Sequence, residues 1–296
     1  MFQLMHSHEQ PGSPVNNKDT RRGERPFSKL RWSLIAIFGV FVVLLYSVPS
    51  LFGIQFIVFI ALLFVIAILH GVERYGARNT TVFFFTACAV SLFFEAITIR
   101  AAFAPSILYH YAMPLVIPGL GVPLTVIFAY FAAGYFSWML SHVLTGQYNT
   151  KLKGKWILVV PFIGAFIMVM WDLGMDPIFS TVLKQWVWQT PGPYYFGVPI
   201  PNYSAWFNLV FIIYLLFALF LSKYDRIQPQ KMNTLNGKPY WIEAAVVYGL
   251  IGLSIIVAPI SNTNDITLSM ALVTVFTMIF VAIISFITIM NNDELM

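Results

Sequence analysis

The chain has 296 residues, of which 59% are hydrophobic and only 10% are charged, and its mean hydropathy is +0.78. A soluble domain carries about 25% charged residues, so this composition excludes a water-soluble fold and predicts an all-α, polytopic transmembrane helical bundle. The net charge of +5 comes from Lys and Arg on loops and gives no indication of nucleic-acid binding. The single Cys88 lies in an apolar run, which leaves no disulfide framework and no cysteine metal cluster.

Three segments are distinguished by polarity. Residues 1–31 are polar and basic, and we expect them to form a disordered cytoplasmic tail. Residues 32–290 form a single transmembrane helical domain, and 291–296 a short C-terminal tail. The first apolar run has no small-residue cleavage signature after it, so it is a retained span and not a signal peptide.

A helix needs about 20 apolar residues to cross the hydrocarbon core. Eight segments meet this requirement, and the Pro49-Ser50 pair separates the first two into a tight helical hairpin. The predicted spans are 32–48, 51–70, 81–100, 121–141, 156–175, 206–222, 241–259 and 267–290.

Basic residues predict the orientation of these spans. If the spans alternate, 15 of the 17 Lys and Arg fall on one side, which leaves only Arg100 and Lys184 opposite. The two termini are therefore predicted to be cytoplasmic. The unusual polar residues then gather toward the non-cytoplasmic face, namely Glu95, Arg100, His110, Asp172, Asp176 and Lys184.

Two segments resemble one another and suggest a parallel internal repeat. Glu95 precedes a loop with Tyr109-His110-Tyr111 and then the run 121–124, Gly-Val-Pro-Leu. Asp172 precedes a loop with Tyr194-Tyr195 and then the run 197–200, Gly-Val-Pro-Ile. The distance from acid to glycine is 26 residues in the first segment and 25 in the second. Membrane proteins often place a binding site where repeats meet, although Gly-Val-Pro before a helix is also ordinary helix-start chemistry.

Three acids are the candidate catalytic residues, because an ionisable group within a span is costly and is a functional candidate by default. Asp172 and Asp176 are four residues apart and share a helix face if the helix persists. Pro177 is expected to end the helix at Asp176, so Asp176 could instead be a turn residue. Glu95 could pair with Arg100, five positions on, as a structural ion pair. A buried acid without a cation is suited to be a neutral proton donor.

Aromatic residues crowd the predicted outer boundary near these acids. An aromatic belt at the membrane interface accounts for each of them singly. Their π faces could also stabilise a carbocation or line a groove for a polyene. Asn202 could orient a water molecule or cap the following helix, and His110 on its loop could be only an interfacial residue. The candidate substrate-binding residues are Trp186, Trp188, Tyr194, Tyr195, Trp206, Asn202, Tyr109, Tyr111, His110 and Arg100.

Other chemistries have little support in the sequence. The chain has no Gly-rich phosphate loop, no HExxH motif, no paired Cys-His spacing and no GxSxG motif. The Asp172–Asp176 pair is similar to the magnesium-diphosphate motifs of intramembrane prenyltransferases. Those enzymes use a second acidic cluster, whereas the later acids here, Asp225, Glu243 and Asp265, are scattered. We expect no metal and no cofactor.

The second block of the chain resembles the carotenoid biosynthesis protein family, which includes bisanhydrobacterioruberin hydratase and the carotenoid 1,2-hydratases. The resemblance covers roughly residues 90–210. It rests on Asp176-Pro177, Trp186-x-Trp188, the run 192–199 (Gly-Pro-Tyr-Tyr-Phe-Gly-Val-Pro), Asn202 and Trp206, and upstream on Glu95, Tyr109-x-Tyr111 and Gly121-Val122-Pro123. The chain departs from the family pattern in residues 96–108, which contain no glycine, and at Ala205, where a glycine is common. These departures leave the exact substrate open.

The resemblance implies cofactor-free hydration of a terminal isopropylidene double bond in a lipophilic polyene or polyprenoid. A protonated acid, Asp172 or Asp176, would give a tertiary carbocation that water captures, with Glu95 orienting water or balancing charge. Trp186, Trp188, Tyr194 and Tyr195 would then face the cation. Composition and charge predict an integral membrane protein that contacts lipids and no nucleic acid, and we expect it in the bacterial cytoplasmic membrane.

Three alternatives remain open at this stage. A membrane terpene cyclase or isomerase would use the same protonation without adding water. A transporter could use intramembrane acids for proton coupling, although it would need polar groups on the inner half, where spans one, two and eight offer few. A magnesium-dependent prenyltransferase is the third.

Overall fold

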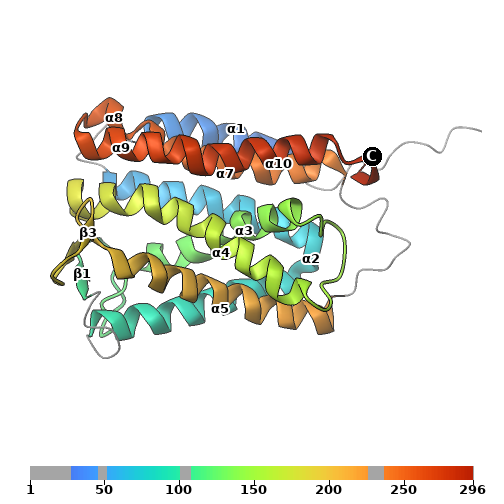
Figure 1. Cartoon of the computed structure of the whole chain (residues 1–296), viewed down its shortest axis with the longest axis horizontal. Coiled ribbons are helices and arrows are strands. Elements are labelled where there is room, and N and C mark those ends of the chain that lie inside the picture. The colour runs from blue at the N-terminus through green and yellow to red at the C-terminus, as the bar shows by residue number, and fades with distance from the viewer. Residues whose placement is uncertain (1–27, 46–51, 101–107, 226–236, 296) are drawn as a thin grey trace, which may run out of the picture.

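The computed structural model describes residues 28–45, 52–100, 108–225 and 237–295. It is a bundle of long helices with two short strand pairs at one end (Figure 1). The elements are α1 (Ser28–Leu44), α2 (Phe52–Ile99), β1 (Tyr109–Tyr111), α3 (Leu124–Leu144), α4 (Trp156–Asp176), η3 (Pro177–Val182), β2 (Trp186–Trp188), β3 (Tyr194–Tyr195), β4 (Val198–Pro199), α5 (Ile200–Tyr224), α7 (Lys238–Ile256), α8 (Ala258–Ser261), α9 (Asp265–Thr274), η4 (Val275–Ile279), α10 (Phe280–Met290) and η5 (Asp293–Leu295). The predicted all-α class is confirmed. The predicted turn at Pro49-Ser50 and residues 1–27 of the predicted tail lie outside the described residues.

Helix α2 is a hairpin of two helices and not one straight rod. Its backbone leaves helical geometry at Gly76, where φ is 76° and ψ is 162°. The two arms then lie against each other, because the rings of Phe64 and Phe84 are 5.4 Å apart although 20 residues separate them. Close contact continues to the turn, where a Cβ added to Gly71 would be 2.9 Å from the Thr80 side chain. The predicted spans 51–70 and 81–100 therefore occupy the two arms.

Among the described residues, six helices are long and apolar enough to cross a membrane, and the α2 hairpin counts as one of them. Helix α1 has 17 residues, about the shortest length that can span. Each of the eight predicted segments falls on a helix, with the ends shifted by a few residues. The largest shift is at α5, which begins at Ile200 and not near residue 206.

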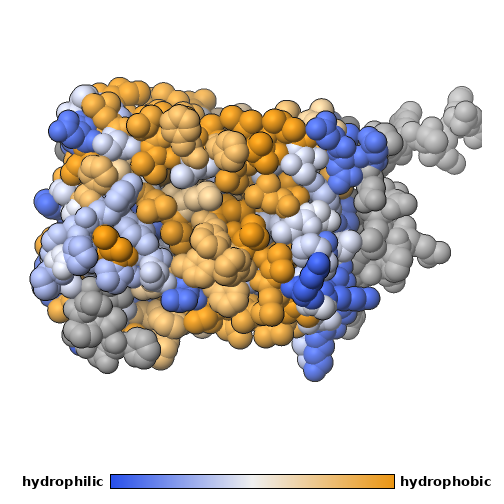
Figure 2. Space-filling view, viewed as in Figure 1, coloured by the Kyte–Doolittle hydropathy of each residue, from blue (hydrophilic) through white to orange (hydrophobic). Residues whose placement is uncertain are grey.

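The surface has the pattern of a membrane protein. An apolar belt runs around the middle of the visible face, and hydrophilic residues gather at both ends (Figure 2). Large apolar side chains are exposed on α2, α10 and the π-helical turn η4, as at Phe85 (62%) and Phe276 (72%). Such side chains are stable in contact with lipid tails and not with water.

Helix α3 lies at the centre of the bundle and brings α4 and α5 together. Most of its residues are buried, including Trp138 and Phe136. Tyr214 of α5 fits between two glycines of the neighbouring helices. Its hydroxyl donates to the Gly134 carbonyl of α3 at 2.6 Å, and a Cβ on Gly164 of α4 would be 3.0 Å from its ring. These small residues let the three helices that carry the site approach closely.

A buried ionic cluster closes the bundle at the end opposite the strands. Arg31 is fully buried and forms salt bridges with Glu73 and with Glu243, the second at 2.5 Å. His70 lies between the Tyr135 hydroxyl (2.6 Å) and the Tyr240 carbonyl (3.0 Å). Arg31 and Glu73 lie just outside the predicted spans 32–48 and 51–70. Helix α1 begins at Ser28, so Arg31 belongs to the helix and not to the tail.

The hairpin turn gives a stability prediction. A side chain at the Gly76 backbone conformation is strained, and such strain costs about 1–3 kcal/mol. A Cβ there would meet no atom within 4 Å, so the cost is conformational and not a clash. We expect Gly76→Ala to lower the free energy of unfolding by roughly that amount, measured as a lower midpoint of thermal unfolding in detergent.

The matched control is Gly39→Ala in α1. Its Cβ would be 3.5 Å from Leu250, which is an ordinary contact. We expect an unchanged or slightly higher midpoint for this variant. Equal midpoints for the two variants would contradict the proposed role of Gly76.

Candidate functional site

Two connections at one end of the bundle, far apart in sequence, pair as antiparallel strands. In the pairing of β1 with β2, Tyr109 lies opposite Trp188, His110 opposite Val187 and Tyr111 opposite Trp186. Because side chains alternate along a strand, the four aromatic residues share one face and turn inward. His110 and Val187 are exposed on the other face. The pair thus presents an aromatic layer to the helix ends.

The two aspartates lie one helical turn apart at the end of α4. Asp172 is fully buried and Asp176 is 2% exposed. The α-helix ends at Asp176 as predicted, but Pro177 does not turn the chain out of helical geometry there. Asp176 has helical dihedrals (φ −59°, ψ −45°), and the chain continues as a π-helical turn through Val182. The wider turn accommodates the proline, and the Ser180 hydroxyl donates to the Asp176 carbonyl at 2.8 Å.

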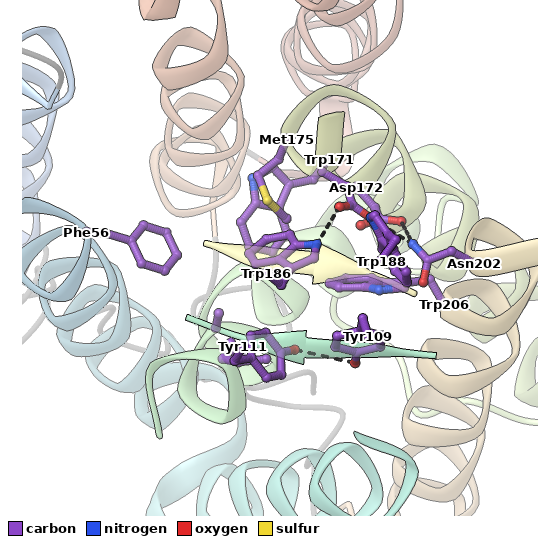
Figure 3. A pocket seen from close by; sticks show the side chains of 13 residues that line it. Phe56, Tyr109, Tyr111, Trp171, Asp172, Met175, Trp186, Trp188, Asn202 and Trp206 are labelled. Atoms are coloured by element: carbon purple, nitrogen blue, oxygen red, sulfur yellow. Dashed lines mark hydrogen bonds between the residues drawn. The ribbon is translucent and has the colours of Figure 1, made fainter. Parts of the chain in front are cut away.

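One amide connects the two aspartates. The Nδ2 of Asn202 donates to Asp176 Oδ2 at 2.8 Å and to Asp172 Oδ2 at 3.4 Å. Trp186 Nε1 donates to the other oxygen of Asp176 at 2.8 Å. The remaining oxygen, Asp172 Oδ1, is buried and has no hydrogen-bond partner among the described residues. The labelled side chains of Trp186, Asp172 and Asn202 lie together at the site (Figure 3).

Glu95 is held by three tyrosines and not by Arg100. Tyr109, Tyr111 (2.9 Å) and Tyr130 (2.8 Å) each donate a hydroxyl to its carboxyl group. Arg100 is exposed and donates to the Gly119 carbonyl, so the alternative of a Glu95–Arg100 ion pair is wrong. Burial, and then the neighbouring Glu95 charge, raise the pKa of Tyr109 and Tyr111 well above the ordinary value, which keeps both phenols as donors.

A cavity of about 40 Å³ lies between the acids and the aromatic layer. One water molecule needs about 10–15 Å³ of such volume, so the cavity has room for a few water molecules. Trp188 Nε1 is a second buried polar atom without a partner among the described residues, and its side chain lines the cavity together with Asp172. The lining residues are Phe56, Tyr109, Tyr111, Val126, Ala129, Trp171, Asp172, Met175, Asp176, Trp186, Trp188, Asn202 and Trp206 (Figure 3).

The structure therefore brings together most of the predicted site residues. Asp172, Asp176 and six of the predicted binding residues line the cavity, while Glu95 lies behind Tyr109 and Tyr111. Four predicted binding residues lie elsewhere. Tyr194 is half exposed and donates to the Thr190 carbonyl, Tyr195 contacts Met270 Sδ at 3.8 Å, and His110 and Arg100 are exposed.

Sequence reasoning missed Tyr130, the third donor to Glu95. The spacing of the two similar segments could have identified it. Tyr130 follows Gly121 by nine residues, just as the predicted site residue Trp206 follows Gly197 by nine. The two rings stack at 4.7 Å with an interplanar angle of 27°. Phe56 and Met175 were also missed, and nothing in their spacing distinguishes them from other apolar residues.

The strand pairing supports a different correspondence between the two segments of the predicted repeat. Tyr109 and Tyr111 follow Glu95 by 14 and 16 residues, and Trp186 and Trp188 follow Asp172 by the same 14 and 16. The counterpart of β1 is therefore β2, whereas Tyr194-Tyr195 forms its own hairpin with β4. Antiparallel pairing of matching strands is the arrangement that a two-fold axis along the bundle produces.

The later acids do not join this site. Glu243 pairs with Arg31 and Asp225 with Arg74 (3.5 Å), both at the opposite end of the bundle. Asp265 is exposed in the first turn of α9. Among the described residues, no group of three or more His, Cys, Asp or Glu side chains is arranged to hold a metal ion.

Fold and site together define a polytopic membrane protein with a buried, acid-lined aromatic cavity at one end. The family model described as carotenoid biosynthesis protein matches residues 51–280, so the chain belongs to that family. The match includes all the residues of the cavity. Comparisons with curated proteins and with solved structures gave no match.

The bridging amide gives a prediction about the site. In Asn202→Leu, the aspartates lose their shared donor, and an unsatisfied buried polar group costs about 1–3 kcal/mol. We expect a lower thermal unfolding midpoint in detergent. Asn208→Leu on the same helix is the control, because Asn208 is exposed. A midpoint for Asn202→Leu that equals that of the control would show that the amide does not hold the acids.

Proposed function

We propose that the protein is a cofactor-independent hydratase, which adds water across a terminal isopropylidene double bond of an acyclic polyene or polyprenoid. Its substrate would reach the site from the hydrocarbon core of a bacterial cytoplasmic membrane. The observation that carries the proposal is the unpaired Asp172 Oδ1, buried beside Asp176 in an aromatic cavity. Family membership supports a role in carotenoid biosynthesis.

The aspartate pair would act as the proton donor. Two carboxyl groups that share one amide donor are suited to hold one proton between them, because two adjacent negative charges in an apolar site repel each other. Protonation at the less substituted alkene carbon gives a tertiary carbocation. Water then forms the new C–O bond and returns a proton to the carboxylate, so the acid is regenerated in each turnover.

The aromatic layer and Glu95 would stabilise the cation. Trp186, Trp188 and Trp206 line the cavity, and π faces attract a positive charge. Glu95 contributes through Tyr109 and Tyr111, which lie between it and the cavity. It is therefore a positioning and charge-balancing residue, not a group that touches the alkene. Preorganised groups of this kind lower such a barrier by several kcal/mol.

The cavity as it stands accommodates water and not a hydrocarbon end group. Substrate binding therefore requires the aromatic wall to move. Trp188 is the best placed to do so, since its ring is only partly buried and its Nε1 has no partner among the described residues.

The same protonation could serve a cyclase or isomerase, in which a second double bond or the loss of a proton consumes the cation. The cavity favours hydration, because its two unpaired polar atoms, Asp172 Oδ1 and Trp188 Nε1, match a bound water. Product mass distinguishes these outcomes, since a hydratase adds one water and the others leave the mass unchanged.

We expect Asp172→Asn and Asp176→Asn to lower hydration by about 10²–10⁴-fold, the usual contribution of general acid catalysis. Glu95→Gln should have a smaller effect, because it removes charge and leaves the acid pair in place. The measurement is the mass of products in cells that accumulate lycopene or a similar acyclic polyene. A chelator should leave the yield unchanged, which separates hydration from magnesium-diphosphate chemistry.

The matched control is Asp265→Asn, which changes an exposed acid on α9. It should retain full activity at equal expression. Full activity in Asp172→Asn and in Asp176→Asn would sink the proposal, as would transport of an unchanged substrate by proteoliposomes.

A further inference from the structure

A second cavity, of about 70 Å³, lies on the other side of the π-helical turn that follows Asp176. Of its lining residues, Ser261 and Asn262 are exposed, whereas the apolar Ile178 and Ala258 and the polar Thr267 are buried.

The ring of Phe179 packs against the linings of both this cavity and the acid-lined one. Phe179 packs against Phe52 of the second cavity, with ring centroids 5.1 Å apart. It also packs against Phe56 and Trp186 of the acid-lined cavity, at 5.0 and 5.7 Å. Phe179 is carried by the π-helical turn, whose first residue directly follows Asp176. The two linings also meet directly where Phe52 and Phe56 stack with ring centroids 6.2 Å apart.

The second cavity reaches the surface at a polar position. Ser261 and Asn262 are exposed at the end of α8, at the same end of the bundle as the strands (Figure 1). Ile178 and Ala258, nearer the acids, are each 1% exposed. A space with a polar mouth and the buried, polar Thr267 in its wall admits water from the aqueous side, whereas a polyene approaches from the lipid.

We propose that the second cavity delivers the water that captures the carbocation, and that water passes when the Phe179 ring moves aside. This inference rests on the proposed hydratase function. The alkene π electrons take the proton of the aspartate pair and form a C–H bond, which leaves the tertiary cation. A water oxygen lone pair then forms the C–O bond, and the extra proton of that water goes to the aspartate pair. The net change is alkene plus water giving a tertiary alcohol.

The test follows the fate of the cation in D₂O. A cation that meets no water loses a proton instead, and the alkene returns with deuterium and without added oxygen. The ratio of hydrated product to deuterated alkene therefore reports water delivery separately from acid strength. Purified protein in detergent or nanodiscs is incubated with the polyene, and both products are quantified by mass spectrometry.

Two variants narrow the route without changing the acids. Ala258→Phe fills the inner part of the cavity, and Ser261→Trp covers its exposed mouth, where a large side chain is tolerated by the fold. We expect the ratio to fall by about tenfold or more in both, which requires only about 1.4 kcal/mol of added barrier to water capture. Phe179→Ala joins the two cavities and should keep the ratio at or above that of the natural chain.

Ile260→Phe is the matched control, because Ile260 lies on α8 but is 79% exposed and does not line the cavity. It should leave the ratio unchanged. An unchanged ratio in both Ala258→Phe and Ser261→Trp would overturn the water route. Equal losses of hydrated product and deuterated alkene would have the same meaning, because they leave the ratio unchanged. Absence of both products with the natural chain would instead refute the hydratase function itself.

Discussion

The structure depends on the burial of three carboxyl groups at one end of an apolar bundle. In hydrocarbon, every polar group has to find its partners within the protein. Glu95 accepts from three tyrosines, and the aspartate pair accepts from Asn202 and Trp186. Three of these five donors lie on β1 and β2. The small strand pair, unusual in a helical membrane protein, is therefore what makes the burial of the acids possible.

The start of α5 follows from the same requirement. The helix begins at Ile200, several residues before its apolar run, so that Asn202 lies in the first turn beside the aspartates. The partial positive charge at a helix N-terminus also favours a nearby carboxylate. On the α4 side, the π-helical turn keeps the backbone helical past Pro177, which places Asp176 and Phe179 on one continuous element. The end of α4 and the start of α5 therefore place the aspartates and their amide donor, in addition to spanning the membrane.

Composition and hydropathy were sufficient to predict the helical membrane fold, because the bilayer dictates the length and apolarity of each helix. The acids were also predictable, since a charge within a span is rare and needs an explanation. The pairing of strand β1 with strand β2 could not be predicted. The correspondence of Tyr109-x-Tyr111 with Trp186-x-Trp188 was hidden because the residue types differ, and the pair Tyr194-Tyr195 offered a more obvious match. Pro177 led us to predict non-helical geometry at Asp176. A π-helical turn accommodates the proline, which has no backbone N–H, and no sequence pattern predicted that turn.

The placement of cations separates structural acids from candidate reactive ones. At one end of the bundle, Arg31 forms salt bridges with Glu73 and Glu243, and Arg74 forms one with Asp225. At the other end, among the described residues, no Lys or Arg forms a salt bridge with any of the three buried acids. Arg100 is only five residues from Glu95, yet it turns to the Gly119 carbonyl.

A fold that needed only stability could have used such a cation, because an unneutralised buried acid is costly. An acid that must give and regain a proton, however, is disabled by a permanent ion pair, which holds the carboxylate charged. Among the described residues, the three acids at this site form no salt bridge, whereas Glu73, Glu243 and Asp225 do. This difference is what the proposed proton transfer requires.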